Sequence, residues 1–233
     1  MGISFPVGFK ALVVGSSGAI GGAFVDHLRQ HTACGEVVCV DRSGFPGFDL
    51  QDASSIERLG AELAGQGPFH FIVDATGALV IDGVGPEKSL AQLDCAALQR
   101  SFAVNALGPA VLLRHLATRL ASGDMVYSKL SARVGSIADN RKGGWYGYRA
   151  SKAALNMVLQ TAAVELQRRH PGLRVVALQP GTVRSRLSAP FATGVPELLE
   201  PAESVAGLMR AMLALPRQSG AQFIDYRGQT VPW

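Results

Sequence analysis

Short apolar runs alternate along the chain with segments in which apolar residues recur every three or four positions. The apolar runs predict buried strands at 11–14, 36–44, 69–77, 124–132, 174–183 and 221–228. The helical spacing predicts helices at 23–31, 53–63, 94–121, from Tyr148 to about Arg169, and at 203–215. This alternation indicates an α/β fold, a doubly wound parallel sheet between helices in three layers.

Two stretches fall outside this alternation. Residues 48–52, FDLQD, follow a short third strand or a turn. Residues 184–201 are rich in Pro, Ser and Ala with little regular pattern, so we expect a mobile segment that covers a substrate site. The chain has no internal repeat, low-complexity tract or linker, so residues 1–233 are expected to form a single domain.

A polar residue interrupts the apolar pattern of the long helical stretch 94–121. Asn105 has apolar neighbours and is followed closely by Gly108-Pro109, a pair that breaks helices. The backbone groups that such a break frees need partners. An exposed asparagine is the simple alternative, but the apolar neighbours favour a buried Asn105 with a working role.

A glycine-rich turn with the spacing G-x-x-G-x-x-G joins the first predicted strand to the first predicted helix. Gly15 allows a tight turn, Gly18 lets the backbone approach a pyrophosphate, and Gly21 allows close helix packing. The helix N-terminus adds free N–H groups and the positive end of the helix dipole. We therefore expect this turn to bind a dinucleotide through Gly15, Ser16, Ser17, Gly18, Ala19, Ile20 and Gly21.

The second predicted strand ends in two residues that favour different dinucleotides. Asp41 is placed to bond the hydroxyls of the adenosine ribose, and its charge would repel the 2′-phosphate of NADP. Arg42 is suited to meet that 2′-phosphate, unless it is a solvated loop residue. The sequence leaves NAD and NADP open, and the charge of Asp41 favours NAD.

Tyr148 and Lys152 stand four residues apart at the start of a predicted helix, so they share one face. A free tyrosine has a pKa of about 10, and a lysine cation one turn away is expected to lower it. The pair then suits proton exchange with an alcohol or carbonyl oxygen. The Y-x-x-x-K spacing alone also fits an ordinary amphipathic helix, so the surrounding motifs have to decide.

The composition argues against several other classes of protein. Of 233 residues, 48% are hydrophobic and 17% charged, which is typical of a compact globular chain. The net charge is +4, but the basic residues form no long run, so no nucleic-acid partner is expected. No apolar run reaches the roughly 18 residues of a membrane helix, and the N-terminus lacks the apolar core of a signal peptide. Cys34, Cys39 and Cys95 form no disulfide or metal pattern, which favours a cytoplasmic protein without a metal site.

Together these motifs resemble those of the short-chain dehydrogenase/reductase family over nearly the whole chain. The matching residues are the glycines of the cofactor loop (Gly15, Gly18, Gly21), the pair that meets the adenine (Asp49-Leu50), the N-N-A-G segment (Asp74-Ala75-Thr76-Gly77), the helix asparagine (Asn105), the catalytic pair (Tyr148 and Lys152) and the P-G-x-V turn (Pro180-Gly181-Thr182-Val183). The loop SARVGSIADNRKGGWYGYRASKAALN is similar to a subgroup that includes the bacterial C-factor proteins and the insect carbonyl reductase sniffer.

The resemblance implies a Rossmann fold and an oxidoreductase that moves a hydride between NAD or NADP and a small-molecule carbonyl or secondary alcohol. It implies that Tyr148 exchanges a proton with the substrate, that Lys152 holds the nicotinamide ribose, and that Asn105 carries a water linking Lys152 to solvent. Ala75, Thr76 and Gly77 would also contact the cofactor. The resemblance further implies a homodimer or a homotetramer.

The chain departs from the family at three places. Ala132 stands where the family has its catalytic serine, so the adjacent Ser131 is the candidate catalytic serine and Ser136 a further one. Strand alternation, however, directs Ser131 to the opposite face from residue 132. Asp74 puts a charge where the family has an amide, and Val14 replaces the usual threonine of the glycine loop.

These departures keep other functions open. A dinucleotide-binding signalling or regulatory protein of C-factor type with little turnover is the main alternative, motivated by Ala132 and the C-factor-like loop. A nucleotide-binding fold with a different ligand is the third. As an enzyme, the chain is expected to have reduced activity, because Ala132 removes a hydrogen-bond donor from the reacting oxygen.

Overall fold

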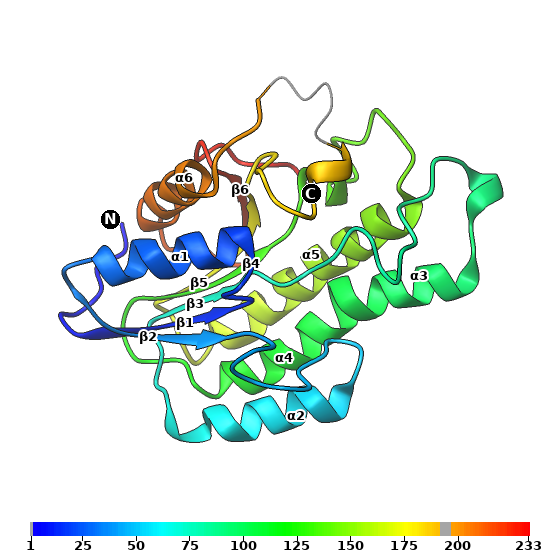
Figure 1. Cartoon of the computed structure of the whole chain (residues 1–233). Helices are drawn as coiled ribbons and strands as arrows, with labels where there is room; N and C mark the ends of the chain where they lie inside the picture. Colours follow the sequence, from blue (N-terminus) through cyan, green and yellow to red (C-terminus); the bar gives the residue numbers. More distant parts are fainter. Residues whose placement is uncertain (1, 192–196) are drawn as a thin grey trace.

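The computed structural model describes residues 2–191 and 197–233 and contains one six-stranded parallel sheet (Figure 1). The strand order is β2-β1-β3-β4-β5-β6. The strands are β1 (Phe9–Val14), β2 (Cys34–Val40), β3 (Phe71–Asp74), β4 (Met125–Leu130), β5 (Leu173–Gln179) and β6 (Gln222–Asp225). The doubly wound parallel sheet expected from the sequence is confirmed.

Helices cover both faces of the sheet, as Figure 1 shows. One face carries α1 (Ala19–Gln30) and α6 (Pro201–Leu213), and the other carries α2 (Ala53–Glu62), α4 (Gly108–Ala117) and α5 (Tyr146–Leu166). The strands are apolar throughout because alternate side chains enter the two cores. In β1, for example, Ala11 and Val13 pack under α1, while Leu12 and Val14 pack on the opposite side.

The stretch 94–121, expected as one helix, has three parts. α3 (Cys95–Phe102) passes into a π-helical segment, Ala103–Leu107, and then into α4. The wider turn lies where Asn105 interrupts the apolar pattern, and Asn105 is fully buried. The next position, Gly108, requires glycine because a side chain there would overlap the carbonyl oxygen of Leu50. The expected burial of Asn105 is confirmed. Instead of the break expected at Gly108-Pro109, the π-helical segment changes to the α-helix α4 there.

The two stretches outside the alternation have irregular structure. Residues 48–52 form a turn rather than a strand. Of the expected cover, 184–201, residues 192–196 lie outside the described residues. The described part contains a 3₁₀ turn at Ala189–Phe191 and a bridge between Val183 and Leu199.

The carboxyl ends of the parallel strands meet along one edge of the sheet. The glycine turn follows β1, the segment Ala75–Gly77 follows β3, and Ser131 follows β4 at this edge. Chain connections leave in opposite directions from β1 and β3, which makes the crevice between them the usual ligand position in such sheets. Among the described helices, none has the length and apolarity needed to cross a membrane.

Candidate active site

The glycine turn is built from close backbone contacts that leave no room for side chains. Gly15 has φ +84°, and the N–H of Gly18 donates to its carbonyl oxygen at 3.0 Å. A side chain on Gly21 would overlap that same oxygen, and one on Gly15 would press on Ala75. The turn is exposed above the first turn of α1, whose N–H groups have no partner within the helix. These features fit the pyrophosphate of a dinucleotide.

Asp41 lies directly beside this turn. The hydroxyl of Ser16 donates to its Oδ2 at 2.8 Å, and the N–H groups of Ser43 and Gly44 donate to its Oδ1. The hydrogen bond from Gly44, with those from Ser16 and Ser43, holds the pKa of Asp41 below its usual value despite an opposing effect of burial. Arg42 is exposed and makes no hydrogen bond or ion pair with the described chain. The charge nearest the turn is therefore negative.

The turn that holds Asp49 and Leu50 is anchored to neighbouring helices. The N–H of Asp49 donates to the hydroxyl of Ser55 in α2, and that hydroxyl donates back to the carbonyl of Asp49. Leu50 packs on the core and against Gly108, whereas Asp49 is exposed. This turn therefore has a fixed position between α2 and α4, and the contact of its residues with adenine stays a prediction.

Tyr148 and Lys152 lie one turn apart near the start of α5. The ammonium nitrogen of Lys152 is 5.7 Å from the centre of the Tyr148 ring and donates to the carbonyl oxygen of Leu130 at 3.0 Å. Lys152 is buried, and it packs so closely on Gly135 that a side chain there would overlap it. The hydroxyl of Tyr148 has no hydrogen-bond partner among the described residues, which leaves it available to a ligand oxygen.

The start of α5 is held by a residue that the sequence did not single out. Trp145, at the N-cap, has φ +55° and makes no side-chain cap. Glu87, in the loop between β3 and α3, accepts the N–H of Trp145 through its carbonyl oxygen at 2.5 Å. Its carboxylate accepts the N–H of Gly147 at 3.0 Å. Glu87 therefore caps the helix directly before Tyr148 from a position 60 residues away.

The expectation that Lys152 lowers the pKa of Tyr148 is wrong for this structure. Tyr148 is only half-buried by accessible surface, yet the packing around it raises its pKa to about 12. Burial, with repulsion from Lys129, sets the pKa of Lys152 well below its usual value, although Asp74 opposes this. Burial thus disfavours the charged form of each side chain.

Asn105 fixes the segment that follows β3. Its side-chain oxygen accepts the N–H of Ala78 at 3.0 Å, and its amide donates to the carbonyl of Ala78 at 2.9 Å. A side chain on Gly77 would lie 3.2 Å from the Asn105 oxygen and 3.3 Å from the Lys152 nitrogen. Asn105 and Lys152 thus flank the same glycine, and the structure brings both predicted residues together.

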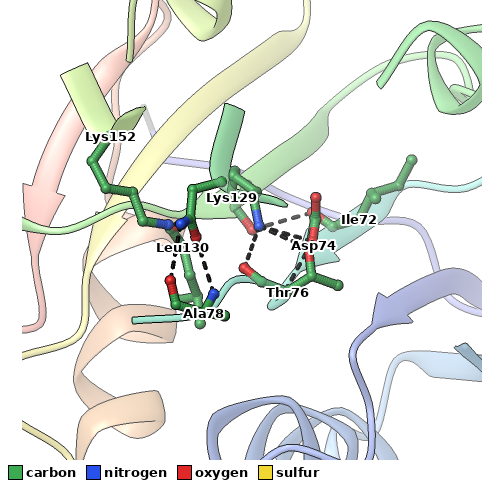
Figure 2. Close-up of polar contacts among 9 residues, drawn as sticks. Ile72, Asp74, Thr76, Ala78, Lys129, Leu130 and Lys152 are labelled. Carbon is green, nitrogen blue, oxygen red and sulfur yellow. Dashed lines mark hydrogen bonds and ion pairs between the residues drawn. The ribbon is translucent and has the colours of Figure 1, made fainter. Parts of the chain in front are cut away.

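A buried ion pair lies next to these groups, as Figure 2 shows. The ammonium of Lys129 is 3.0 Å from Oδ1 of Asp74, and both side chains are fully buried. Lys129 also donates to the carbonyl oxygen of Thr76 at 2.5 Å and to its hydroxyl at 3.0 Å. The charge of Asp74, noted as a departure from the family, therefore has a partner that the sequence did not single out.

The three positions considered for the catalytic serine are all within the described chain. Ala132 has an extended backbone and no hydroxyl. Ser131 is buried and donates to the side-chain oxygen of Asn156 in α5 at 2.6 Å. Ser136 accepts the N–H of Asp139 and donates to the carbonyl of Trp233. Both hydroxyls are thus engaged in hydrogen bonds within the protein, and Asn156, the partner of Ser131, lies on α5 two turns after Tyr148.

The P-G-x-V turn after β5 lies against the described part of the expected cover. Gly181 has φ +79°, and a side chain there would meet Leu199. The N–H of Leu199 donates to the carbonyl of Thr182 at 2.9 Å. Pro180 accepts the hydroxyl of Ser204, which joins this turn to α6.

Tyr148 borders a small cavity of about 30 Å³, and a second cavity of about 550 Å³ shares much of its lining. The shared residues are Val84, Gly85, Pro86, Glu87, Ala97 and Arg100. A larger cavity, about 650 Å³, lies between α6 and β6 and contains none of the predicted catalytic residues. Of these three cavities, the smallest is the one lined by Tyr148. No group of His, Cys, Asp and Glu side chains in the described ranges is placed to hold a metal ion.

Comparisons with known proteins agree with this geometry. Residues 10–195 match the family model for short chain dehydrogenases. The C-signal protein of Myxococcus xanthus is 36% identical over 146 residues, which cover 62% of this chain and 84% of that protein. The 1-hydroxy-2-glutathionyl-2-methyl-3-butene dehydrogenase of Rhodococcus sp. (strain AD45) is 31% identical over 189 residues, 81% of this chain and 79% of that protein.

Among solved structures, a short-chain dehydrogenase/reductase from Burkholderia multivorans with bound NADP is similar over 97% of this chain and 99% of its own. Its sequence identity is 28% and its TM-score 0.80. The match to the family model, the dehydrogenase relative and this structure all extend over most of the chain. The chain therefore belongs to the short-chain dehydrogenase family, as a nicotinamide-dependent oxidoreductase of C-factor-like type.

Proposed function

We propose that the protein reduces a small-molecule carbonyl to an alcohol, with Tyr148 as the proton donor. The observation that carries this proposal is the state of Tyr148: its hydroxyl is free among the described residues, and a pKa of about 12 keeps it protonated near neutrality. A neutral phenol can donate a proton to a carbonyl oxygen, whereas alcohol oxidation would need the phenolate. A bound nicotinamide supplies the hydride.

Lys152 and Asn105 have supporting roles in this proposal. Lys152 lies within reach of Gly77 and would bond the ribose next to the nicotinamide. Asn105 is hydrogen-bonded to both the N–H and the carbonyl oxygen of Ala78, which keeps this wall of the crevice in place. The water expected to link Asn105 to Lys152 stays a prediction. Residues Gly15–Gly21, Ala75–Gly77 and Pro180–Val183 would hold the dinucleotide.

The protein is proposed to work without a serine hydroxyl at the substrate oxygen. Ala132 occupies that position, and the hydroxyls of Ser131 and Ser136 are engaged elsewhere. Tyr148 would be the main hydrogen-bond donor to the developing oxyanion, so a reduced rate is expected.

NAD is the proposed dinucleotide. The carboxylate of Asp41, bound to Ser16 of the glycine turn, supports a ribose with free hydroxyls. Arg42 is exposed and could turn toward a 2′-phosphate, and the Burkholderia neighbour binds NADP. Dissociation constants for both dinucleotides decide the matter, and NADP binding tenfold tighter than NAD would overturn the preference.

The test of activity is a panel of aldehydes, ketones and quinones with NADH and NADPH, followed through the absorbance of the reduced nicotinamide. A hydroxylated glutathione conjugate belongs in the panel with NAD, because the Rhodococcus relative is named for such a substrate. Turnover that disappears in Tyr148→Phe supports the proposal. Turnover that survives in that variant would move the chemistry to another group.

A second function, dinucleotide-dependent signalling with little turnover, is supported by the similarity to C-signal and by Ala132. It predicts that the protein binds a dinucleotide but turns over nothing in the panel. Failure to bind either dinucleotide would instead favour a different ligand.

Assembly and location complete the proposal. A homodimer or homotetramer is supported by exposed apolar side chains on α5, including Met157 and Val164. Sedimentation of the purified protein tests it, and a monomer at micromolar concentration would contradict it. The three free cysteines support a cytoplasmic location.

A further inference from the structure

The charged pair Asp74–Lys129 occupies neighbouring strand ends at the centre of the site. The two residues are directly opposite each other in the register of β3 and β4. They point to the same face of the sheet and are both fully buried. Buried charges are costly unless they are paired, so a pair at this position needs an explanation.

Hydrogen bonds with both members of the pair hold Thr76, the first residue of the segment Thr76–Ala78. Oδ1 of Asp74 accepts the N–H of Thr76 at 2.9 Å and its hydroxyl at 2.5 Å. Lys129 donates to Thr76 as well, through its carbonyl and its hydroxyl. Thr76 is thus tied to both charges, as the dashed lines in Figure 2 show.

The same segment is the surface on which the catalytic groups lie. Gly77 faces the Lys152 nitrogen and the Asn105 oxygen, and Ala78 is bound to Asn105. Lys152 donates to Leu130, the residue that follows Lys129 in β4. Lys129 and Lys152 therefore both hold backbone oxygens of this small region.

We propose that Asp74 and Lys129 are a positioning pair of the active site, which fixes Thr76 beside the Gly77 and Ala78 that meet Lys152 and Asn105, and which acts electrostatically on the catalytic lysine. This inference deepens the proposed function, since it assigns Lys152 a role there, but its test requires no turnover.

The charged surroundings of Lys152 make the effect specific. Lys129 from β4 repels it, Asp74 from β3 attracts it, and Tyr148 lies on its own helix. The other nearby cations are turned away: Arg133 pairs with Asp139 and Asp225, and Arg149 donates to the carbonyls of Gly143 and Gly144. Removing one member of the pair therefore changes the field at Lys152 with a known sign.

The experiment measures the titration of Lys152 by NMR in dinucleotide-free protein with isotope-labelled lysines. Lys152→Arg assigns the signal, and the exposed Lys88 and Lys142 serve as references. Lys129→Gln removes the repelling cation, so the midpoint of Lys152 should rise by about one pH unit, the scale of a neighbouring charge. Asp74→Asn removes the attracting anion, so the midpoint should fall by about the same amount.

The double variant Asp74→Asn/Lys129→Gln restores a neutral pair. We expect its Lys152 midpoint to return close to that of the wild type. This variant also guards against misfolding, because Lys129→Gln alone leaves Asp74 buried without its cation and can lower the unfolding midpoint. Asp74→Asn likewise leaves Lys129 buried without its anion, although Lys129 keeps both contacts with Thr76.

Ser128→Ala is the matched control. Ser128 is also buried in β4 and also bonds β3, through the carbonyl of Ile72 at 3.1 Å, but it carries no charge and does not touch Thr76. The amide signals of Thr76 and Ala78 should move in both single charge variants and stay in place in Ser128→Ala.

Three outcomes would overturn the proposal. Shifts of the Lys152 midpoint in the same direction for both single variants would show that the variants loosen the structure around Lys152 rather than change the charge near it. An unchanged midpoint in both would show that the pair does not act on Lys152. An equal shift in Ser128→Ala would show that the loss of any contact between β3 and β4 moves the Lys152 midpoint. Absence of turnover in the wild type, combined with the expected titration shifts in the variants, would leave this proposal standing and count against the proposed function instead.

Discussion

The half of the crevice proposed to hold the dinucleotide and the half proposed to carry the reaction are built by opposite means. The glycine turn requires the absence of side chains at Gly15 and Gly21, because a side chain on either would displace neighbouring backbone. Around Lys152 the site consists of buried, ionisable side chains. Lys129 pairs with Asp74 and donates to the carbonyl oxygen of Thr76, and Lys152 donates to the carbonyl oxygen of Leu130.

This difference determines what each half tolerates. The glycine turn depends on shape, so it should resist changes of charge and pH but not an added methyl group. The reacting half depends on which buried groups are charged, so it should respond to single charge changes and to pH. Substitutions that separate shape from charge therefore test the comparison.

The largest effect is expected from Tyr148→Phe. The change removes the only hydroxyl beside Lys152 that is free among the described residues, with almost no change in shape. We expect turnover to fall by about a hundredfold or more, the scale of a general acid, while dinucleotide affinity stays unchanged. Steady-state kinetics and a binding titration measure the two. Tyr146→Phe, two residues earlier in α5, is the control and should have near-normal turnover.

Ala132→Ser should produce the next largest effect, in the opposite direction. Residue 132 has an extended backbone that accepts serine, and the new hydroxyl would supply a donor for the substrate oxygen. One such donor is worth about a hundredfold in rate, so a gain approaching that size is expected in kcat.

Ser131→Ala and Ser136→Ala separate this prediction from its alternative. Their hydroxyls are bound to Asn156 and to Trp233, so each change should alter stability more than turnover. No gain in Ala132→Ser, combined with loss of activity in either alanine variant, would show that the affected serine serves the substrate.

Gly21→Ala tests the shape-dependent half. The added methyl group would overlap the carbonyl of Gly15 and force the turn to move. Overpacking of this kind costs about 1–3 kcal/mol, so dinucleotide affinity should fall about tenfold to a hundredfold. Gly22→Ala is the matched control, since a methyl group there would lie 3.4 Å from the carbonyl of Ser16 and fit. Equal affinity in the two variants would remove the turn from the binding site.

The same contrast explains how much could be predicted from the sequence. The glycine turn follows directly from residue types and local spacing, because glycine geometry is encoded where it is used. The alternating apolar runs likewise predict the strands and a parallel sheet, and the apolar neighbours of Asn105 predict its burial.

The reacting half depends on contacts between distant residues, which local patterns do not contain. Asp74 and Lys129 are 55 positions apart and meet only because β3 pairs with β4 in one register. The contact between Glu87 and Gly147 spans 60 positions. The pKa of Tyr148 was predicted in the wrong direction for the same reason, since burial is a property of the packed site.

A smaller effect is expected at the boundary of the two halves, from Asp41→Asn. The variant keeps side-chain hydrogen bonding with Ser16 but removes the charge beside the proposed position of the adenosine ribose. Relief of repulsion should strengthen NADP binding by about tenfold, or about 1.4 kcal/mol, and change NAD binding little. Comparing dissociation constants for both dinucleotides measures this. A loss of NAD binding as large as the gain for NADP would mean that Asp41 contributes through hydrogen bonds to the ribose rather than through charge.

The smallest effect is an absence of change, and it concerns the ionisation of Tyr148. A raised pKa means that the protonated form persists to higher pH, so the tyrosine should begin to lose its proton only as the pH approaches about 12. An ultraviolet titration of the dinucleotide-free protein, taken as the difference between wild type and Tyr148→Phe, isolates this one group. We expect no tyrosinate signal in that difference near neutral pH. Ionisation of Tyr148 near pH 7 or 8 would contradict the raised pKa and would remove the observation on which the proposed role of Tyr148 as proton donor rests.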